Sequence, residues 1–390
     1  MDGNYEVQYN GIDGDYLLHQ KTLHFGDFNV NTPFASQALD QWTGSDTPLN
    51  SVRGFNEVYR QVSIDYLTSD RDLDGEIART LDRADDDSVS CLFFSIPSER
   101  PVDPELLREL AKLQAKHSAY YAVPFRPKIV DAINSKDREV NIEEYFGYYE
   151  STVSDYLNIV SDLDPEKPVM GAIPALRWGM IRKLIQRYIE RDIAAMCVNF
   201  NGRSPLVSPA QVDNILVPLQ SEIGFHNWQF DGFLYAINAH RGQRAAAADF
   251  LALAAGFDAI GGYHTSPSGD KEFFDNIPDV TPLRVFRRHS YTYDEIPVGE
   301  VANRFPKETN LDPDRAQRFA ENGNAGGIRK VLTAEQMGLA ANTLRQEIRT
   351  GNAGQFIQSK LVGDGRELDA LQAIRSEFDS DSKQEGLAGD

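Results

Sequence analysis

A regular alternation of apolar strand segments and helical segments is the feature that most restricts the fold of this chain. From about residue 88 onward, nearly continuous apolar runs of strand length are each followed by a stretch with helical periodicity. Such runs are typical of parallel strands that are buried on both faces. The pattern therefore predicts an α/β fold with a parallel sheet. The six strand segments are residues 88–97, 119–125, 168–176, 193–200, 232–239 and 257–263.

Two upstream segments decide between two architectures. Residues 57–67 and 25–37 can each supply one further strand. Eight strands would form a (β/α)8 TIM-like barrel, whereas six would form a doubly wound sheet. No G-x-G-x-x-G motif follows the first strand, which favours the barrel. We expect N-terminal strands that cap the barrel in 1–30, the barrel in 31–300, a helical extension packed on it in 301–375, and a disordered acidic tail in 376–390.

Local signals mark several helix ends. Asp103 and Pro104 are suited to the N-cap and the first turn of a helix. Residues 242–256 have the composition of an alanine-rich helix that a glycine ends, and residues 333–351 form an amphipathic pattern that should end at Gly351.

The charge balance indicates the solvent to which the protein is adapted. The 390 residues carry a formal net charge of −20, and the pI is about 4.8. Excess acid with little lysine is typical of proteins dissolved in concentrated salt, and it predicts a haloarchaeal origin. The two cysteines, Cys91 and Cys197, lie in apolar strand segments and cannot build a disulfide framework. Without a signal peptide or an apolar run of membrane-spanning length, the protein is expected to be cytoplasmic.

Polar residues gather where the predicted strands end. In a barrel these carboxyl ends form the binding face. Arginine follows nearly every strand, and in a chain of charge −20 this predicts a mouth that receives an anion. The residues at these ends are Glu99, Arg100, Arg126, Asn199, Asn201, Arg203, Asn238, His240, Arg241, Tyr263 and His264.

A basic segment just beyond the last strand adds Arg284, Arg287 and Arg288 among aromatic residues. It predicts contacts to a nucleic-acid backbone, with a salt-bridged surface as the alternative. The histidines are scattered singly and no metal-binding spacing occurs. We therefore expect no metal site and no cofactor.

Several segments over roughly residues 168–360 occur in an order that resembles the tRNA-guanine transglycosylases, barrel enzymes that exchange guanine in nucleic acid for a 7-deazaguanine. "FLYAINAHRG" is similar to the family's strand that ends in G-A-G-H-P, with His240 at the histidine. "AAGFDAIGGYH" resembles its G-x-D-x-F-D-S-x-x-Y segment, with Gly256 and Asp258 at the first two positions. The other matching segments are "PVMGAIPALRWGMIRK", "CVNFNGRSPL", "RKVLTAEQMGLAANTLRQEIRTG" and, near the N-terminus, "FNVNTPFASQ".

The chain departs from the family's pattern at the positions that carry its chemistry. In the register that matches G-x-D, the nucleophilic aspartate is replaced by Gly261, and in the alternative register Asp258 takes its place. Ser95 stands where the second aspartate belongs, and Arg126 where the base-reading aspartate belongs. The structural zinc motif is missing. The resemblance therefore carries over neither guanine recognition nor the zinc site.

The resemblance implies a pentosyltransferase that exchanges or inserts a guanine or 7-deazaguanine base in DNA or tRNA. Its catalytic residues would be Asp258 or Glu99 with His240. Ligand contacts would come from the other strand-end residues, and a homodimer or a heteromer with a related transglycosylase would be the assembly. One alternative is an inactive barrel that binds nucleic acid or a nucleotide as the subunit of an active partner. Another is an unrelated barrel enzyme for a small phosphorylated or carboxylated substrate.

Overall fold

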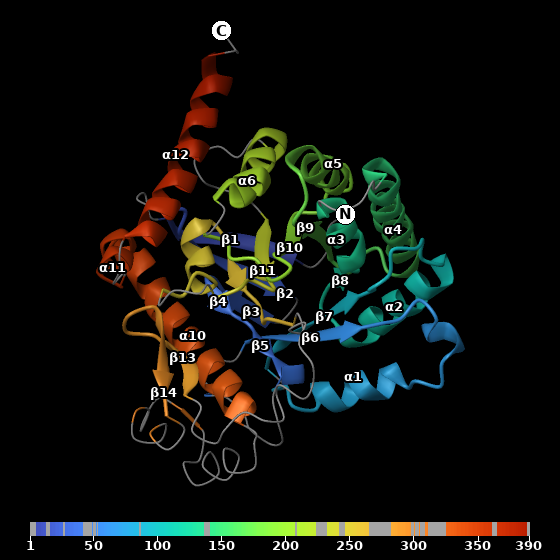
Figure 1. Cartoon of the computed structure of the whole chain (residues 1–390), viewed down its shortest axis with the longest axis horizontal. Helices are drawn as coiled ribbons and strands as arrows, with labels where there is room; N and C mark the ends of the chain where they lie inside the picture. The colour runs from blue at the N-terminus through green and yellow to red at the C-terminus, as the bar shows by residue number, and fades with distance from the viewer. Residues whose placement is uncertain are drawn as a thin grey trace.

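Two parallel sheets lie at the centre of the molecule, as the computed structural model in Figure 1 shows. The six-stranded sheet has the order β4 (Phe34–Ala35), β12 (Ala259–Ile260), β11 (Phe233–Ile237), β10 (Ala195–Asn199), β9 (Val169–Pro174) and β8 (Tyr121–Ala122). The three-stranded sheet has the order β5 (Gln37–Ala38), β6 (Phe55–Gln61) and β7 (Val89–Ser95). The prediction of an α/β fold with a parallel sheet is thus confirmed. The structure describes residues 5–12, 16–25, 28–41, 49, 52, 54–85, 87–135, 141–206, 209–223, 232–241, 246–264, 282–297, 300, 304, 309–310, 325–360 and 365–387.

The two sheets are linked at two places. Ser36 alone separates β4 from β5, and its backbone N donates to the carbonyl of Ile260 at 2.9 Å. At the other link, Ser95 at the end of β7 forms a parallel bridge with Phe125, just beyond β8. The backbone N of Phe125 donates to Phe94 O, and that of Ile96 to Phe125 O, both at 2.8 Å.

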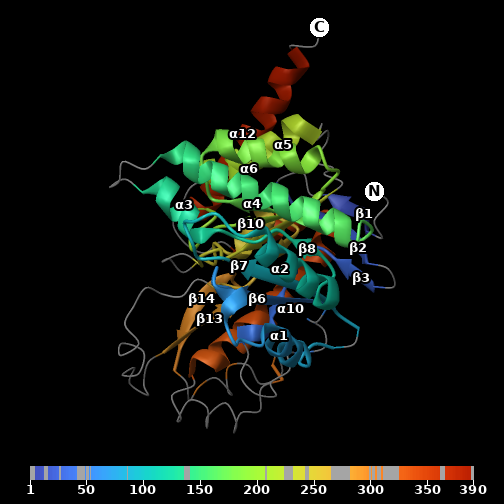
Figure 2. The same ribbon diagram turned by 90° about the vertical axis from the view of Figure 1, so that its right-hand side faces the viewer.

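Helices surround the strands because each has one apolar face to bury. Asp103 caps α2 through a hydrogen bond from the backbone N of Glu105, and Pro104 is its first residue, as the sequence predicts. In Figure 2, α2 and α4 lie along the same side of the molecule. The helices that follow β6 to β10 are α1 (Leu73–Leu81), α2 (Pro104–His117), α3 (Pro127–Asn134), α4 (Ile142–Leu163), α5 (Trp178–Ile189) and α6 (Pro209–Ile223).

An antiparallel sheet of β1 (Tyr5–Ile12), β2 (His19–Phe25) and β3 (Phe28–Asn31) precedes the parallel strands. Its link to them is a buried ionic cluster. Lys21 Nζ donates to Asp258 Oδ2 at 3.0 Å and to Gly232 O at 2.9 Å, and His19 Nε2 lies 2.8 Å from Asp258 Oδ1. Lys21 and Asp258 are 0% exposed. Because Asp258 and Gly232 precede β12 and β11, the cluster lies at the amino ends of the strands.

The last part of the chain differs from expectation in several elements. The helix expected over 242–256 is a short 3-10 helix, η5 (Phe250–Ala255), within the described residues. All of its residues are buried. The segment therefore packs against neighbours on every side, whereas an amphipathic helix buries only one face. An antiparallel hairpin, β13 (Leu283–Arg287) and β14 (Thr292–Ile296), occupies the basic segment.

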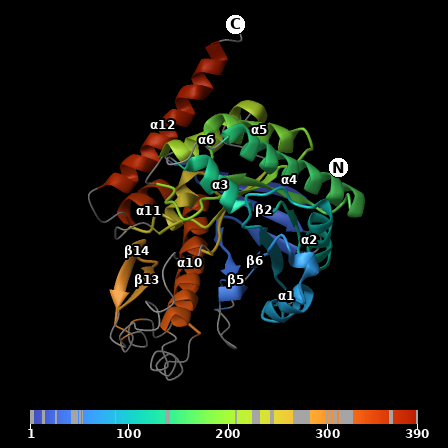
Figure 3. The same cartoon turned by 45° about the vertical axis from the view of Figure 1, so that its right-hand side comes forward.

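Within the part of the chain that the structure describes, the helices α10, α11 and α12 follow the hairpin (Figure 3). α10 (Ala325–Thr350) packs against β13 and begins eight residues before the expected start at 333. It stops at Gly351, which has a left-handed φ of 72°. α11 (Ala353–Lys360) comes next, and α12 (Arg366–Leu387) continues through most of the tail that was expected to be disordered. Of the helical extension expected over 301–375, most of residues 301–324 lie outside the described residues. None of the helices described is long and apolar enough to cross a membrane.

Candidate functional site

A buried carboxylate, Glu57, is the third residue of β6, and its oxygens reach the segment that follows the carboxyl end of β12. It is 0% exposed. Its Oε1 accepts hydrogen bonds from the backbone N of Gly262 at 2.6 Å and from His264 Nε2 at 2.5 Å. Its Oε2 accepts from Ser36 Oγ at 3.1 Å and from the hydroxyl of Tyr235. The donors are Tyr235 in the middle of β11, Ser36 between β4 and β5, and two residues of the segment after β12, so this one side chain joins segments that are far apart in the chain.

The glycine pair after β12 gives Glu57 the room it occupies. A Cβ atom on Gly261 would lie 2.5 Å from Glu57 Oε2 and 2.6 Å from the hydroxyl oxygen of Tyr235. A Cβ on Gly262 would lie 2.5 Å from Glu57 Oε1. Real Cβ atoms do not approach oxygen so closely. The carboxylate of Glu57 therefore stands where side chains of residues 261 and 262 would otherwise project.

His264 is the cationic partner of this carboxylate. Its ring stacks on Tyr59 with the centroids 4.5 Å apart and the planes at 6°. Its Nδ1 lies 3.4 Å from Asp40 Oδ2, on the side opposite Glu57. Burial lowers the pKa of His264, but the charge of Glu57 and the hydrogen bonds to Asp40 and Glu57 outweigh it and raise the pKa to about 9. At neutral pH both ring nitrogens of His264 are thus protonated, and the side chain carries a positive charge.

Two buried asparagines hold the loops around this pair. Asn238 has a left-handed φ of 56°, and its Oδ1 accepts from the backbone N of His264 at 2.7 Å. Its Nδ2 donates to Asn199 Oδ1 at 3.2 Å, which also accepts from the backbone N of Asn201 at 2.9 Å. Asn201 Nδ2 donates to Asp131 Oδ1 at 3.0 Å. The asparagine amides predicted to contact the ligand thus form hydrogen bonds within the protein.

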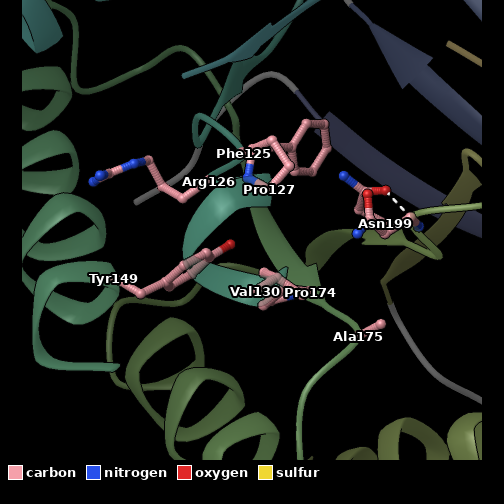
Figure 4. A pocket seen from close by; sticks show the side chains of 9 residues that line it. Phe125, Arg126, Pro127, Val130, Tyr149, Pro174, Ala175 and Asn199 are labelled. Carbon is pink, nitrogen blue, oxygen red and sulfur yellow. Dashed lines mark hydrogen bonds between the residues drawn. The ribbon is translucent and has the colours of Figure 1, made fainter. Parts of the chain in front are cut away.

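Arg126 is buried rather than presented at the strand ends. It is 1% exposed, and burial lowers its pKa to about 10. Its guanidinium donates to Thr152 Oγ1 of α4 at 2.6 Å and to the carbonyl oxygens of Ser98 and Arg100. Figure 4 shows it extending away from Asn199, beside a space of only about 10 Å³, the room of about one water molecule. Arg126 therefore anchors the loop after β7 on α4.

A larger hollow of about 720 Å³ lies where β6 and β7 end. This is within the range of small-molecule sites, about 300–1,000 Å³. It is open to solvent and lined by Gln61, Ser63, Ile64, Arg71, Pro97 and Ser98.

The two carboxylates predicted from sequence lie apart from Glu57. Asp258 is at the amino ends of the strands, paired with His19 and Lys21 as described above. Glu99 follows β7, and its Oε2 accepts from the hydroxyl of Tyr145 on α4 at 3.2 Å. Neither contact brings these groups to His240.

Other predicted residues form the exposed part of the strand ends. Tyr263 is 43% exposed, and its ring meets that of His240 edge-on with centroids 5.9 Å apart. The backbone N of His240 donates to Arg203 O at 2.9 Å, which places the exposed Arg203 beside it. Arg100 is also exposed.

The basic segment lies on the β13–β14 hairpin. Arg241 and Arg284 both approach the ring of Tyr293 on β14, with their guanidinium carbons 5.6 Å and 5.5 Å from its centroid. Arg287 Nε lies 3.7 Å from Asp294 Oδ2 within the hairpin. Arg288 is half-buried in the turn between the two strands.

Sequence reasoning missed Glu57, although a signal was present. Glu57 interrupts a strand whose neighbours in "FNEVY" are mostly apolar, and a charge at a buried strand position needs partners. A scan of protein-family models finds none that matches the chain, and no curated protein matches it either. The geometry of the site is therefore the basis for a functional proposal.

Proposed function

We infer that the two parallel sheets form one closed (β/α)8 barrel. β4 and β5, divided only by Ser36, count as one strand that pairs with β12 on one side and β6 on the other. The bridge from Ser95 to Phe125 joins the remaining edges. This gives eight strands in chain order, which is the arrangement expected from the sequence and supports a binding face at their carboxyl ends.

We propose that the protein acts on nucleic acid as a transglycosylase-like pentosyltransferase, with Glu57 as its carboxylate. The observation that carries the proposal is the position of Glu57. Its oxygens occupy the side-chain space of Gly261, the residue at which the resemblance expects the nucleophile. A carboxylate from β6 would thus replace one from β12 at almost the same point in space. A buried carboxylate beside a histidine of strongly raised pKa is also the kind of pair found at functional sites.

Glu57 and His264 together supply the nucleophile and the proton donor that base exchange needs. A Glu57 oxygen attacks C1′ of the target nucleoside, the glycosidic C–N bond breaks, and its electron pair leaves with the base, which takes a proton from His264. The incoming base then attacks C1′ through its ring nitrogen, returns a proton to His264 and displaces the carboxylate. No cofactor is required.

The network around Glu57 must open for this reaction. Each carboxylate oxygen already has two donors, and the side chain is 0% exposed. A nucleoside reaches it only when the backbone at Gly262 and the ring of His264 withdraw from Oε1. Exposed Tyr263 lies between these two residues, so a ligand that contacts Tyr263 acts directly on this segment.

The same closure favours a second candidate function. A carboxylate with four donors and no exposure is well suited to hold loops together. In that case the protein binds nucleic acid or a nucleotide at the strand ends as the subunit of an active partner, without exchanging a base itself.

The two candidates differ in the role of one carboxylate, so Glu57→Gln is the decisive variant. We expect purified protein to incorporate labelled guanine or 7-deazaguanine into DNA or tRNA in high salt. Glu57→Gln should lower the rate on the order of 10⁴-fold, as expected for loss of a nucleophile. Glu109→Gln, an exposed change of the same kind on α2, is the control.

Three further measurements complete the test. Thermal unfolding shows that Glu57→Gln is folded, and Glu57→Asp, which keeps the charge, replaces it if it is not. Full exchange by Glu57→Gln contradicts the role of Glu57. A wild-type rate in Glu57→Asp, whose side chain is shorter by one methylene group, contradicts the need for its oxygens beside Gly261. If the wild-type protein exchanges no base in either nucleic acid but binds it, the second candidate holds.

A further inference from the structure

A hollow of about 130 Å³ lies where α10 packs against the N-terminal sheet and the start of the parallel strands. Phe34 and Phe55, the first residues of β4 and β6, form part of its apolar wall together with Ala341 of α10. At about 30 Å³ per water molecule in the liquid, the hollow has room for about four, or for an organic group of a few non-hydrogen atoms. It lies at the amino ends of these strands, whereas Tyr263 and His264 follow the carboxyl end of β12.

Arg345 of α10 carries the only charge among the described residues that line this hollow. Its Nη1 donates to the backbone oxygens of Asn31 at 3.2 Å and of Pro33 at 2.7 Å, and its Nη2 donates to Asn342 Oδ1. A guanidinium has five N–H groups, so the N–H of Nε and one N–H of Nη2 form no hydrogen bond within the described part of the chain. No carboxylate of the described residues forms an ion pair with Arg345 either.

The surroundings of Arg345 favour an anion as its partner. Burial, and after it the charge of Arg349 one turn further along α10, lower the pKa of Arg345 to about 10. Arg345 therefore stays protonated at neutral pH, although much of its charge is kept from water. Charged side chains are rarely buried without a partner of opposite charge, because nothing else offsets the loss of hydration.

We propose that this hollow is a binding site for a small carboxylate. The two remaining N–H groups of Arg345 bind its oxygens, since guanidinium and carboxylate groups form strong charge-assisted hydrogen bonds. A short hydrocarbon tail packs on Phe34, Phe55 and Ala341. A halide ion would leave most of the hollow and its apolar wall unused, and a nucleotide is far larger than about four water molecules. The ligands that fit are therefore carboxylates of the size of acetate to butyrate.

The hollow lies between three parts of the molecule that Arg345 already connects. Asn31 ends β3, Pro33 leads into β4, and Arg345 binds both of their carbonyl groups from α10. A carboxylate bound here adds a contact between these parts, so the unfolding temperature rises with its concentration. Because the site lies at the amino ends of the strands, carboxylate binding and base exchange are separate properties, and either can be present without the other.

Isothermal titration calorimetry of the full chain with acetate, propionate, butyrate and octanoate, at constant ionic strength, measures the site directly. Affinity should rise by up to about fourfold for each added methylene that the apolar wall buries, and octanoate, which exceeds the hollow, should gain nothing over butyrate. Arg345→Gln should weaken propionate binding about tenfold or more, since a charge-assisted hydrogen bond is lost. Ala341→Leu should weaken it as well, because the larger side chain fills the hollow. Arg349→Gln, an exposed change of the same kind on α10, is the matched control and should bind propionate as wild type does.

Several results would overturn the site. It is refuted if no carboxylate gives a heat of binding or raises the unfolding temperature, or if Arg345→Gln and Ala341→Leu both bind propionate as wild type does. If chloride or inorganic phosphate binds as tightly as propionate, with the same dependence on Arg345, the carboxylate class is wrong. Where Arg345→Gln does not fold, Arg345→Lys keeps the charge and loses the planar fork, and it should also weaken propionate binding. Propionate binding by a protein that exchanges no base leaves the site standing and removes only the exchange activity.

Discussion

Replacing Asp258 with asparagine should destabilise the fold without acting on the chemistry. Asp258 is 0% exposed and accepts from His19, Lys21 and the backbone N of Leu234. Asparagine keeps the volume but removes the charge, which leaves Lys21 charged and 0% exposed beside a neutral partner. Breaking a buried ion pair in this way costs about 3–5 kcal/mol. That is a large part of the 5–15 kcal/mol that typically holds a domain folded.

Urea denaturation at constant high salt, followed by tryptophan fluorescence, measures this loss. Salt screens a buried pair little, so the effect should persist in concentrated salt. Asp74→Asn changes an exposed carboxylate that pairs with Lys116 and His117 and should change stability far less. The double variant Lys21→Met/Asp258→Leu should recover most of the loss, because apolar residues often replace a buried pair at little cost.

The acid range gives a second readout of the same residue. Burial raises the pKa of Asp258, but the charges of Lys21 and His19 outweigh it and hold the pKa below its ordinary value. The contribution of Asp258 to the free energy of unfolding is therefore complete above about pH 3.9, the pKa of an aspartate in the unfolded chain. It is lost as the pH falls through the pKa that Asp258 has in the folded protein. If Asp258→Asn is as stable as wild type, the ionic cluster is not an anchor. If it is also inactive in base exchange, Asp258 regains the nucleophilic role that the alternative register gave it.

Two further predictions concern the Glu57 site. Because the pKa of His264 is raised to about 9, its protonation contributes fully to the free energy of unfolding below about pH 6.5. Up to about 3 kcal/mol of this free energy is lost as the pH rises through 9. His264→Gln should abolish this pH dependence of the free energy of unfolding, measured by chemical denaturation across that range. Gly261→Ala would force a methyl group against Glu57 and the Tyr235 hydroxyl, which hydrogen bonds hold in place, and should cost about 1–3 kcal/mol of stability. Gly147→Ala, on α4 with open space at the Cβ position, should be neutral or stabilising by up to about 1 kcal/mol. Equal effects of the two alanines in chemical denaturation would contradict the close approach at Gly261.

Local signals predicted the elements that depend on local chemistry. The cap at Asp103 and the helix end at Gly351 follow from short-range hydrogen bonding and backbone preference, and both are confirmed. The apolar strand runs were located correctly because both of their faces are buried. The alanine-rich run before Gly256 was wrongly predicted to be an α-helix. Its residues are buried on all sides, so the sequence has no periodicity that distinguishes an α-helix from a 3-10 helix.

The site was harder to predict because its partners are distant in the chain. Glu57 and His264 are separated by 207 residues, and Lys21 and Asp258 by 237. Nothing near Asp258 in the sequence shows that it lies at the amino end of its strand beside a lysine. Likewise, the glycines at 261 and 262 looked like a lost catalytic residue, whereas they accommodate a carboxylate that arrives from β6.

The long separation between Lys21 and Asp258 also sets an order of events on the ribosome. At about 5–20 residues per second, roughly 10–50 s pass between synthesis of the lysine and synthesis of its carboxylate. During that time the N-terminal sheet has an ammonium group with no counter-ion at the surface it will later bury. The first strands to emerge therefore have to wait for residue 258, and a nascent chain stalled before it should keep this sheet open to proteases while α2 and α4 are already protected.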